Sequence, residues 1–224
     1  MHSFVSIPAL FVSFWGLFIL ILLPDTAFAR KRFSLEFLPG GALVLPMPLS
    51  ISQERYADLE FTARYRTESF RLPLHYSIRA GYDLTEKSCL ELEFNHLKLF
   101  LDNPPPEIQR FSITHGFNQL WLNYSHHFNG FILRAGLGPV IAHPESKIRN
   151  NLFDEFGGIG ESGNYLGGLT GQLGIQKRFF IGKLFFFSVE GKLNAAWASV
   201  PIAFGRARVP VVCGQTLLGV GLNL

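Results

Sequence analysis

Residues 212–224, VCGQTLLGVGLNL, carry the pattern that decides the fold. Leu218, Val220, Leu222 and Leu224 alternate with glycine and asparagine, and this period of two is typical of a β-strand with one apolar face. The same alternation recurs upstream through most of the chain. The sequence therefore predicts an all-β protein.

The recurring segments predict eight strands, at 33–45, 69–83, 88–100, 110–126, 130–142, 163–178, 181–198 and 207–224. Longer and shorter connections alternate between them, at 46–68, 84–87, 101–109, 127–129, 143–162, 179–180 and 199–206. Residues 59–66 alternate as well. Because bacterial barrels usually have an even number of strands, we assign 59–66 to a hairpin-like first loop, and ten strands are the alternative.

The composition excludes several classes of protein. Of the 224 residues, 17% are charged and 48% are hydrophobic, with 23 Phe and 22 Gly. A disordered chain has few aromatic and many charged residues, and this chain is the opposite. The net charge of +3 is scattered along the sequence, so we expect no nucleic-acid partner. We also expect no cofactor.

The N-terminal segment has the features of an export signal. Residues 4–23 contain no charge, and the small residues of Ala27-Phe28-Ala29 fit a signal-peptidase site. We predict a signal peptide at 1–29 and a single barrel domain at 30–224, with a retained helical anchor as the alternative. No later segment has 18 apolar residues in a row, so strands must form any membrane span of the mature chain.

The face opposite the apolar one favours a membrane barrel over a soluble sandwich. It carries charges, Gln, Asn and many glycines within long strands, as the lumen of a narrow barrel does. Lipid has no water to satisfy an open sheet edge, so the sheet must close. We predict an antiparallel transmembrane up-and-down β-barrel with short turns and both termini periplasmic. A soluble periplasmic β-sandwich is the third alternative.

In alternation and loop rhythm, residues 33–224 resemble the eight-stranded bacterial outer-membrane barrels of the outer membrane protein A and X type. The resemblance implies a monomer in the cell outer membrane, surrounded by lipids and lipopolysaccharide and inserted by the barrel-assembly machinery. It also implies a structural, surface-binding or adhesive role. One departure is the last residue, Leu224, where that class usually ends on an aromatic residue.

Charged residues on the inward face predict an ion network that plugs the lumen. Folding 69–83 against 88–100 about the turn near 85 places Arg79 close to Glu93 and Ser77 close to Asn95. The inward charged and titratable residues are Arg71, His75, Arg79, Glu91, Glu93, Arg134, Glu190 and Lys192. Buried charges need partners of opposite sign, and this set supplies them. A conducting pore is the alternative, although eight strands enclose little space.

The stretch 93–118 is the candidate for a catalytic rim site. Its alternation slips on both sides of a stiff loop with three prolines, and a bulge near 95–96 would turn His96 and Lys98 inward. The catalytic candidates have the types of a nucleophile, bases and an orienting acid, namely Ser112, His96, His115 and Glu93. The alternative function is therefore an enzyme that deacylates lipid A or phospholipid or transfers their acyl chains. A plain cell-surface rim is the simpler interpretation.

Residues 75–77, His-Tyr-Ser, are similar to the His-x-Ser element of the outer-membrane lipid A deacylase family. In that family the element lies late in the chain and faces lipid, whereas here it is early and its parity points inward. We therefore do not infer lipid A deacylase activity for this chain from these residues.

The remaining polar motifs predict turns and loops. His126 and His127 precede Asn129-Gly130, a dipeptide typical of a tight hairpin turn. His143-Pro144-Glu145 opens the longest predicted loop and could bind a cation, but a solvated loop is the simpler interpretation. We therefore predict no metal site.

The aromatic residues and cysteines have structural interpretations. Trp121, Tyr124, Tyr165 and Trp197 are predicted to form girdles at the membrane interfaces, and Phe153, Phe156 and Ile159 to cover the barrel mouth. Cys89 and Cys213 fall on strands that are not neighbours in the barrel, so we predict no disulfide between them.

Overall fold

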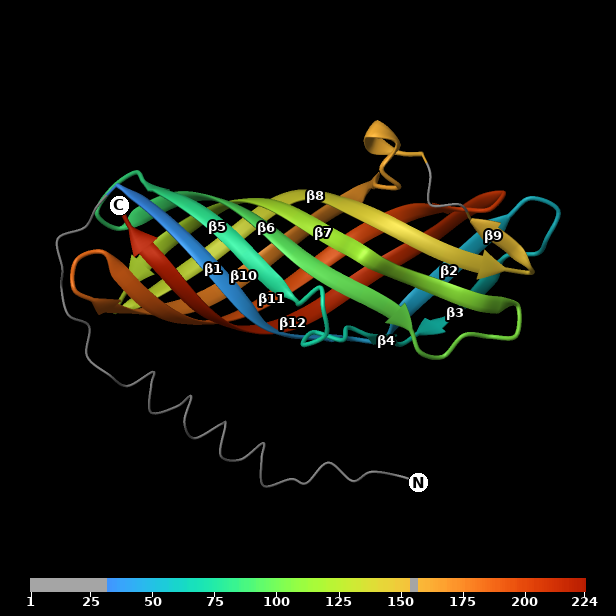
Figure 1. The fold of residues 1–224 in the computed structure, drawn as a ribbon, viewed down its shortest axis with the longest axis horizontal. Helices are drawn as coiled ribbons and strands as arrows, with labels where there is room; N and C mark the ends of the chain where they lie inside the picture. The colour runs from blue at the N-terminus through green and yellow to red at the C-terminus, as the bar shows by residue number, and fades with distance from the viewer. Residues whose placement is uncertain (1–31, 154–156) are drawn as a thin grey trace, which may run out of the picture.

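Antiparallel strands make up most of the computed structural model, which describes residues 32–153 and 157–224 (Figure 1). The strands are β1 (Phe33–Val44), β2 (Met47–Gln53), β3 (Leu59–Ala63), β4 (Tyr65–Arg66), β5 (Tyr76–Asp83), β6 (Ser88–Leu101), β7 (Ile108–Phe128), β8 (Phe131–Ile148), β9 (Asn151–Phe153), β10 (Tyr165–Ile181), β11 (Phe185–Ile202) and β12 (Gly205–Asn223). A short 3-10 helix, η1, spans Ile159–Glu161. In the described ranges no helix has the length and apolar character needed to cross a membrane. The predicted signal peptide, 1–29, lies outside the described residues.

Eight strands form a closed ring, in the order β1-β5-β6-β7-β8-β10-β11-β12, and β12 pairs back with β1. The two ends of the ring meet directly, since the Phe33 amide donates to the Leu224 carbonyl at 3.1 Å. The turns at 84–87, 129–130 and 182–184 lie at the same end of the barrel as these termini (Figure 1). We call this the turn end and the opposite end the loop end. The predicted eight-stranded antiparallel barrel is confirmed.

The first connection contains strands of its own. Pro46, which has no backbone N–H, lies between β1 and β2, and β2 then continues along β12. β3 turns back against β2, and β4 pairs with β6. The alternating segment 59–66 is thus part of a hairpin at the loop end and adds no strand to the ring. The predicted strand 69–83 was too long, because only β5 (Tyr76–Asp83) pairs in the sheet.

Strands β8, β11 and β12 extend further toward the loop end than predicted. β8 runs to Ile148 and takes in His143 and Glu145, which were assigned to a loop. β11 and β12 pair as far as Ile202 and Gly205, so the predicted connection 199–206 shrinks to two residues. The barrel therefore projects beyond the region that alternation alone predicted.

The outward face of the barrel changes along its length. In the half nearer the turn end, large apolar side chains are exposed on the outside, among them Leu92, Leu122, Leu173 and Leu218, at 54–64%. A closed barrel with such an exterior is stable in lipid. In the half nearer the loop end, the outward side chains of β12 are polar, as at Arg208.

The inward face changes in the opposite sense. Near the turn end it is charged, whereas near the loop end it forms a continuous apolar core. Core members from different strands include Leu49, Ile51, Leu97, Leu99, Phe117, Val140, Val200 and Val209. The loop half is therefore built like a water-soluble barrel, with its apolar residues inside.

Two smaller predictions on these strands are confirmed. Cys89 in β6 and Cys213 in β12 are free and buried, and β5 and β1 separate their strands. Asn129 and Gly130 form the two-residue turn between β7 and β8, both with positive φ (48° and 78°) as such a hairpin turn requires.

Candidate functional site

A charged network fills the lumen in the turn half. Its centre is Arg79 on β5, only 1% exposed, whose guanidinium contacts four carboxylates. It donates to Glu93 at 3.0 Å, to Glu36 at 3.2 Å and to Glu190 at 2.8 Å, and lies 3.7 Å from Glu91. As the turn near 85 predicted, Arg79 lies directly opposite Glu93 in the β5–β6 register.

Three more cations complete the charged network. Arg134 on β8 donates to Glu190 at 2.8 Å and forms a two-pronged pair with Glu91. Lys192 pairs with Glu93 and lies 3.3 Å from Glu190. Arg178 donates to Glu36 at 3.2 Å. The members are Glu36, Glu91, Glu93, Glu190, Arg79, Arg134, Arg178 and Lys192, so their formal charges cancel (4 − 4 = 0).

Two residues assigned to the lumen network lie outside it. The Arg71 side chain is 78% exposed, because residues 69–75 are not part of a strand. His75 is buried but makes neutral contacts, to the His96 carbonyl at 2.8 Å and to Gln215 at 3.2 Å. Glu36 and Arg178 were missed. Glu36 could have been found from parity, since its neighbours Leu35 and Phe37 face outward.

Between the charged network and the apolar core lies a layer of amides. Gln215 donates to Asn194 at 3.0 Å, and Asn194 donates to Gln119 at 2.9 Å. Trp121 also points inward and is fully buried, with Lys192 over its ring at 5.1 Å, so its assignment to an interface girdle was wrong. Tyr124 and Trp197 are exposed on the outside at 53% and 74%.

The proposed catalytic residues of the rim are not brought together. Glu93 is in the lumen, whereas His96 points outward, stacks on Tyr76 at 5.5 Å and bonds to Asn118 at 2.8 Å. Ser112 lies further toward the loop end, opposite Phe100. No nucleophile, base and acid of this set share one side of the sheet within reach of each other.

The irregularity in β6 is displaced from its predicted position. It lies between Leu97 and Leu99, so Lys98 and not residues 95–96 forms the bulge. Lys98 is buried and donates to the Arg71 carbonyl at 2.8 Å. His96 therefore keeps the outward parity that it shares with Phe94.

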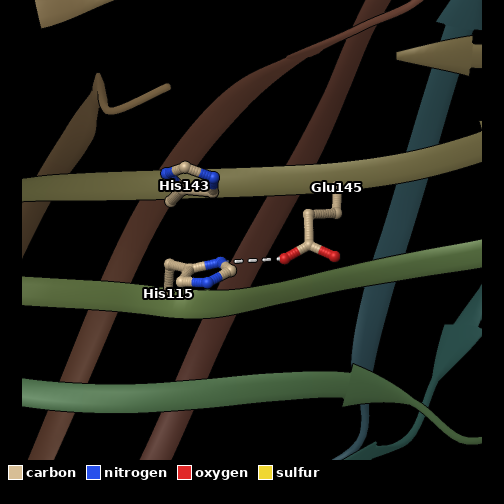
Figure 2. Close-up of side chains that lie close together, drawn as sticks. All are labelled: His115, His143 and Glu145. Atoms are coloured by element: carbon tan, nitrogen blue, oxygen red, sulfur yellow. Dashed lines mark hydrogen bonds and ion pairs between the residues drawn. The ribbon is translucent and has the colours of Figure 1, made fainter. Parts of the chain in front are cut away.

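A second bulge, in β7, builds a different cluster. Ile113 pairs with Pro144 and Phe117 pairs with Ala142, so residues 114–116 all lie opposite His143. Figure 2 shows the result, with His115 and His143 facing each other from adjacent strands and Glu145 beside them. We call His115, His143 and Glu145 the rim cluster.

The rim cluster is held by short polar contacts. His115 Nδ1 lies 3.0 Å from Glu145 Oε1, and the imidazole ring centroids of His115 and His143 are 4.8 Å apart. Thr114 donates to the same carboxylate, and Arg110 forms an ion pair with it. His143 and Glu145 are buried, whereas the His115 side chain is 65% exposed. Two imidazoles and a carboxylate are ligand types that bind transition metals.

The predicted mouth cover is only partly described. Phe153 contacts Tyr165, with ring centroids 6.0 Å apart, so Tyr165 packs at the mouth. Ile159 is 55% exposed, and Phe156 lies outside the described residues.

Comparison with known proteins finds similarity of architecture. No family model matches the chain, and no curated protein matches it in sequence. Among solved structures, the chain is similar to the attachment invasion locus protein Ail of Yersinia pestis (12% identity, 87% of this chain and 99% of that one, TM-score 0.40). It is also similar to Neisserial surface protein A (10%, 88% and 100%, TM-score 0.41). A further similar structure is the outer membrane protein OprG of Pseudomonas aeruginosa (15% identity, 88% of this chain and 99% of that one, TM-score 0.44).

Proposed function

We propose that this chain is a small outer-membrane β-barrel that acts at the cell surface, by binding or by structural support, and does not conduct solutes. The observation that carries the proposal is the filled interior. The charged network occupies the turn half and the apolar core occupies the loop half. A barrel of eight strands has room for little beyond its own side chains.

The exterior supports the membrane placement. The apolar band of the turn half would contact lipid, and the loop half would project outward past the lipopolysaccharide, so the turn end is periplasmic. Insertion would use the barrel-assembly machinery, and the protein would be a monomer, because one chain closes the ring.

A polar groove on the loop half is the candidate surface for a partner. It has a volume of about 520 Å³ and is lined by residues of the β2–β3 and β11–β12 hairpins, which pair with each other through β2 and β12. Asp58 and Glu60 line one side, and Arg206 and Arg208 line the other. A groove with charges of both signs favours a polar partner over an apolar one.

The first experiment measures conductance. The mature protein is refolded, shown to be folded by its heat-modifiable migration on gels, and added to planar lipid bilayers beside a wide porin as positive control. We expect the porin to give channels and this protein to give none above the lipid background. Reproducible single-channel steps would refute a sealed lumen.

The second experiment measures surface binding. Outer-membrane vesicles that carry the wild-type protein are applied to arrays of matrix proteins and glycans. Vesicles with Arg206→Glu and Arg208→Glu serve as the matched variant, because both residues face outward and leave the core untouched. Binding that the double variant loses would support the groove as the binding surface. If wild-type vesicles bind nothing beyond vesicles without the protein, the binding role is wrong.

A further inference from the structure

We propose that the rim cluster of His115, His143 and Glu145 binds a divalent transition-metal ion, with Zn²⁺ as the representative ion. The cluster lies on the outer side of the loop half, away from the charged network and the polar groove. The inference is independent of the proposed function, since it requires neither a sealed lumen nor a binding partner.

A bulge in the β7 backbone brings His115 into contact with His143. Three residues of β7 face one residue of β8, and the extra length carries His115 out to the side of His143. The bulge depends on Gly116, whose φ is 129°. A Cβ at Gly116 would lie 2.2 Å from Asn118 Oδ1, so no other residue fits without rearrangement. Bulges of this kind are frequent where a strand must re-aim a side chain.

The three ligand atoms are close to a metal-binding arrangement. They all lie within 4.8 Å of one another. Zinc bonds of about 2.0–2.2 Å place tetrahedral ligand atoms roughly 3.3 Å apart, so closure on an ion requires movements of about 1.5 Å. His115 can make this movement because its side chain is 65% exposed, whereas His143 and Glu145 are held by burial.

The surroundings of Glu145 suit a carboxylate ligand. Arg110 pairs with Oε2, while Thr114 and His115 both contact Oε1. A metal ion bound at Oε1 replaces the contact with His115 and leaves Arg110 on the other oxygen. Partners of this kind orient a ligating carboxylate.

Two imidazoles and one carboxylate leave a coordination position for water. Ser112 lies opposite Glu145 in the β7–β8 register. It is buried, and its hydroxyl has no hydrogen-bond partner in the described part of the chain. A water molecule on the ion would supply a polar neighbour on this side of the cluster.

The test is metal binding by the refolded full-length mature chain in detergent. Titration with Zn²⁺ is followed by calorimetry, and Co²⁺ serves as a spectroscopic probe of the coordination geometry. We expect one Zn²⁺ per chain, a tetrahedral or five-coordinate Co²⁺ spectrum, and at least about a 10-fold loss of affinity in His115→Ala. His126→Ala is the matched control, because it removes an imidazole from the same strand at the turn end.

His115→Ala is the decisive variant because the residue is exposed, so the barrel should fold normally, which heat-modifiability verifies. His143→Ala and Glu145→Gln should also weaken binding. The proposal is overturned if wild type binds no Zn²⁺, or if His115→Ala binds as well as wild type. It is equally overturned if His126→Ala abolishes binding, since the ion then sits at the turn end. The rim cluster would then be a hydrogen-bonded cluster only.

Discussion

Arg79→Gln tests whether the charged network holds the barrel together. Arg79 contacts Glu36, Glu91, Glu93 and Glu190 while only 1% exposed, so its loss leaves four buried carboxylates with three cations. Removing one partner from a buried ion pair typically costs about 3–5 kcal/mol, mainly because a charge is left uncompensated. We therefore expect the free energy of unfolding to fall by about that amount.

The assay is urea unfolding of the refolded barrel in lipid vesicles, followed by tryptophan fluorescence. Arg208→Gln is the matched control, because this arginine is exposed on the loop half and should change stability by no more than about 0.5 kcal/mol. In the double variant Arg79→Gln/Glu93→Gln, three carboxylates face three cations, so we expect much of the lost stability to return. A loss below about 1 kcal/mol in Arg79→Gln, or no recovery in the double variant, would refute the reasoning.

The remaining predictions concern packing, thiols and lipid chemistry. Gly138→Ala should destabilise the barrel by about 1–3 kcal/mol, because its Cβ would lie 1.7 Å from the Leu120 carbonyl oxygen, whereas Gly191→Ala has open space and should be tolerated in the same unfolding assay. Cys89 and Cys213 are buried and free, so a thiol reagent should label neither in the folded barrel and both after denaturation without reductant. Ser112→Ala should leave the acyl composition of membrane lipids, measured by mass spectrometry, the same as in wild type; a change would revive the enzymatic alternative.

The membrane-facing strands could be predicted because lipid imposes one rule on the outside of each strand. In β11 and β12, every second residue of the turn half must be apolar, and Phe187, Leu193, Leu218 and Val220 obey this rule. A tight turn then sets the register of the next strand. The pair Arg79–Glu93 followed from the turn near 85 for this reason.

The loop half could not be predicted as strand because there the two faces exchange their chemistry. Arg206 and Arg208 lie outside on β12, while Val209 and Val211 point inward. At Arg206 and Arg208 this segment lacks the apolar residues that would face lipid. Its sequence therefore predicts that the strand ends there and a loop begins. The same inversion explains why β8 was predicted to end before His143.

The rim cluster could not be predicted from the sequence for a different reason. His115 and His143 belong to different strands, and their contact depends on how many residues of β7 the bulge absorbs. Interruptions of the apolar–polar alternation indicated that this region is irregular, but they did not give the number of extra residues in the bulge. A displaced bulge changes the parity of the residues between its predicted and actual positions, as at His96, and it decides which residues on neighbouring strands meet. The error at Lys98 has the same origin.

The division of the barrel into two halves limits where function can lie. If the lumen were open, its charged residues would be solvated and each could be replaced at little cost. Instead Glu190 and Glu93 are fully buried and paired, and the core around Leu97 and Val209 separates them from the loop end. If the lumen is sealed as proposed, a ligand from outside meets apolar packing before it can reach a charge. Under the proposed function, an external partner is therefore bound on the outer surface of the loop half, where the groove and the rim cluster both lie.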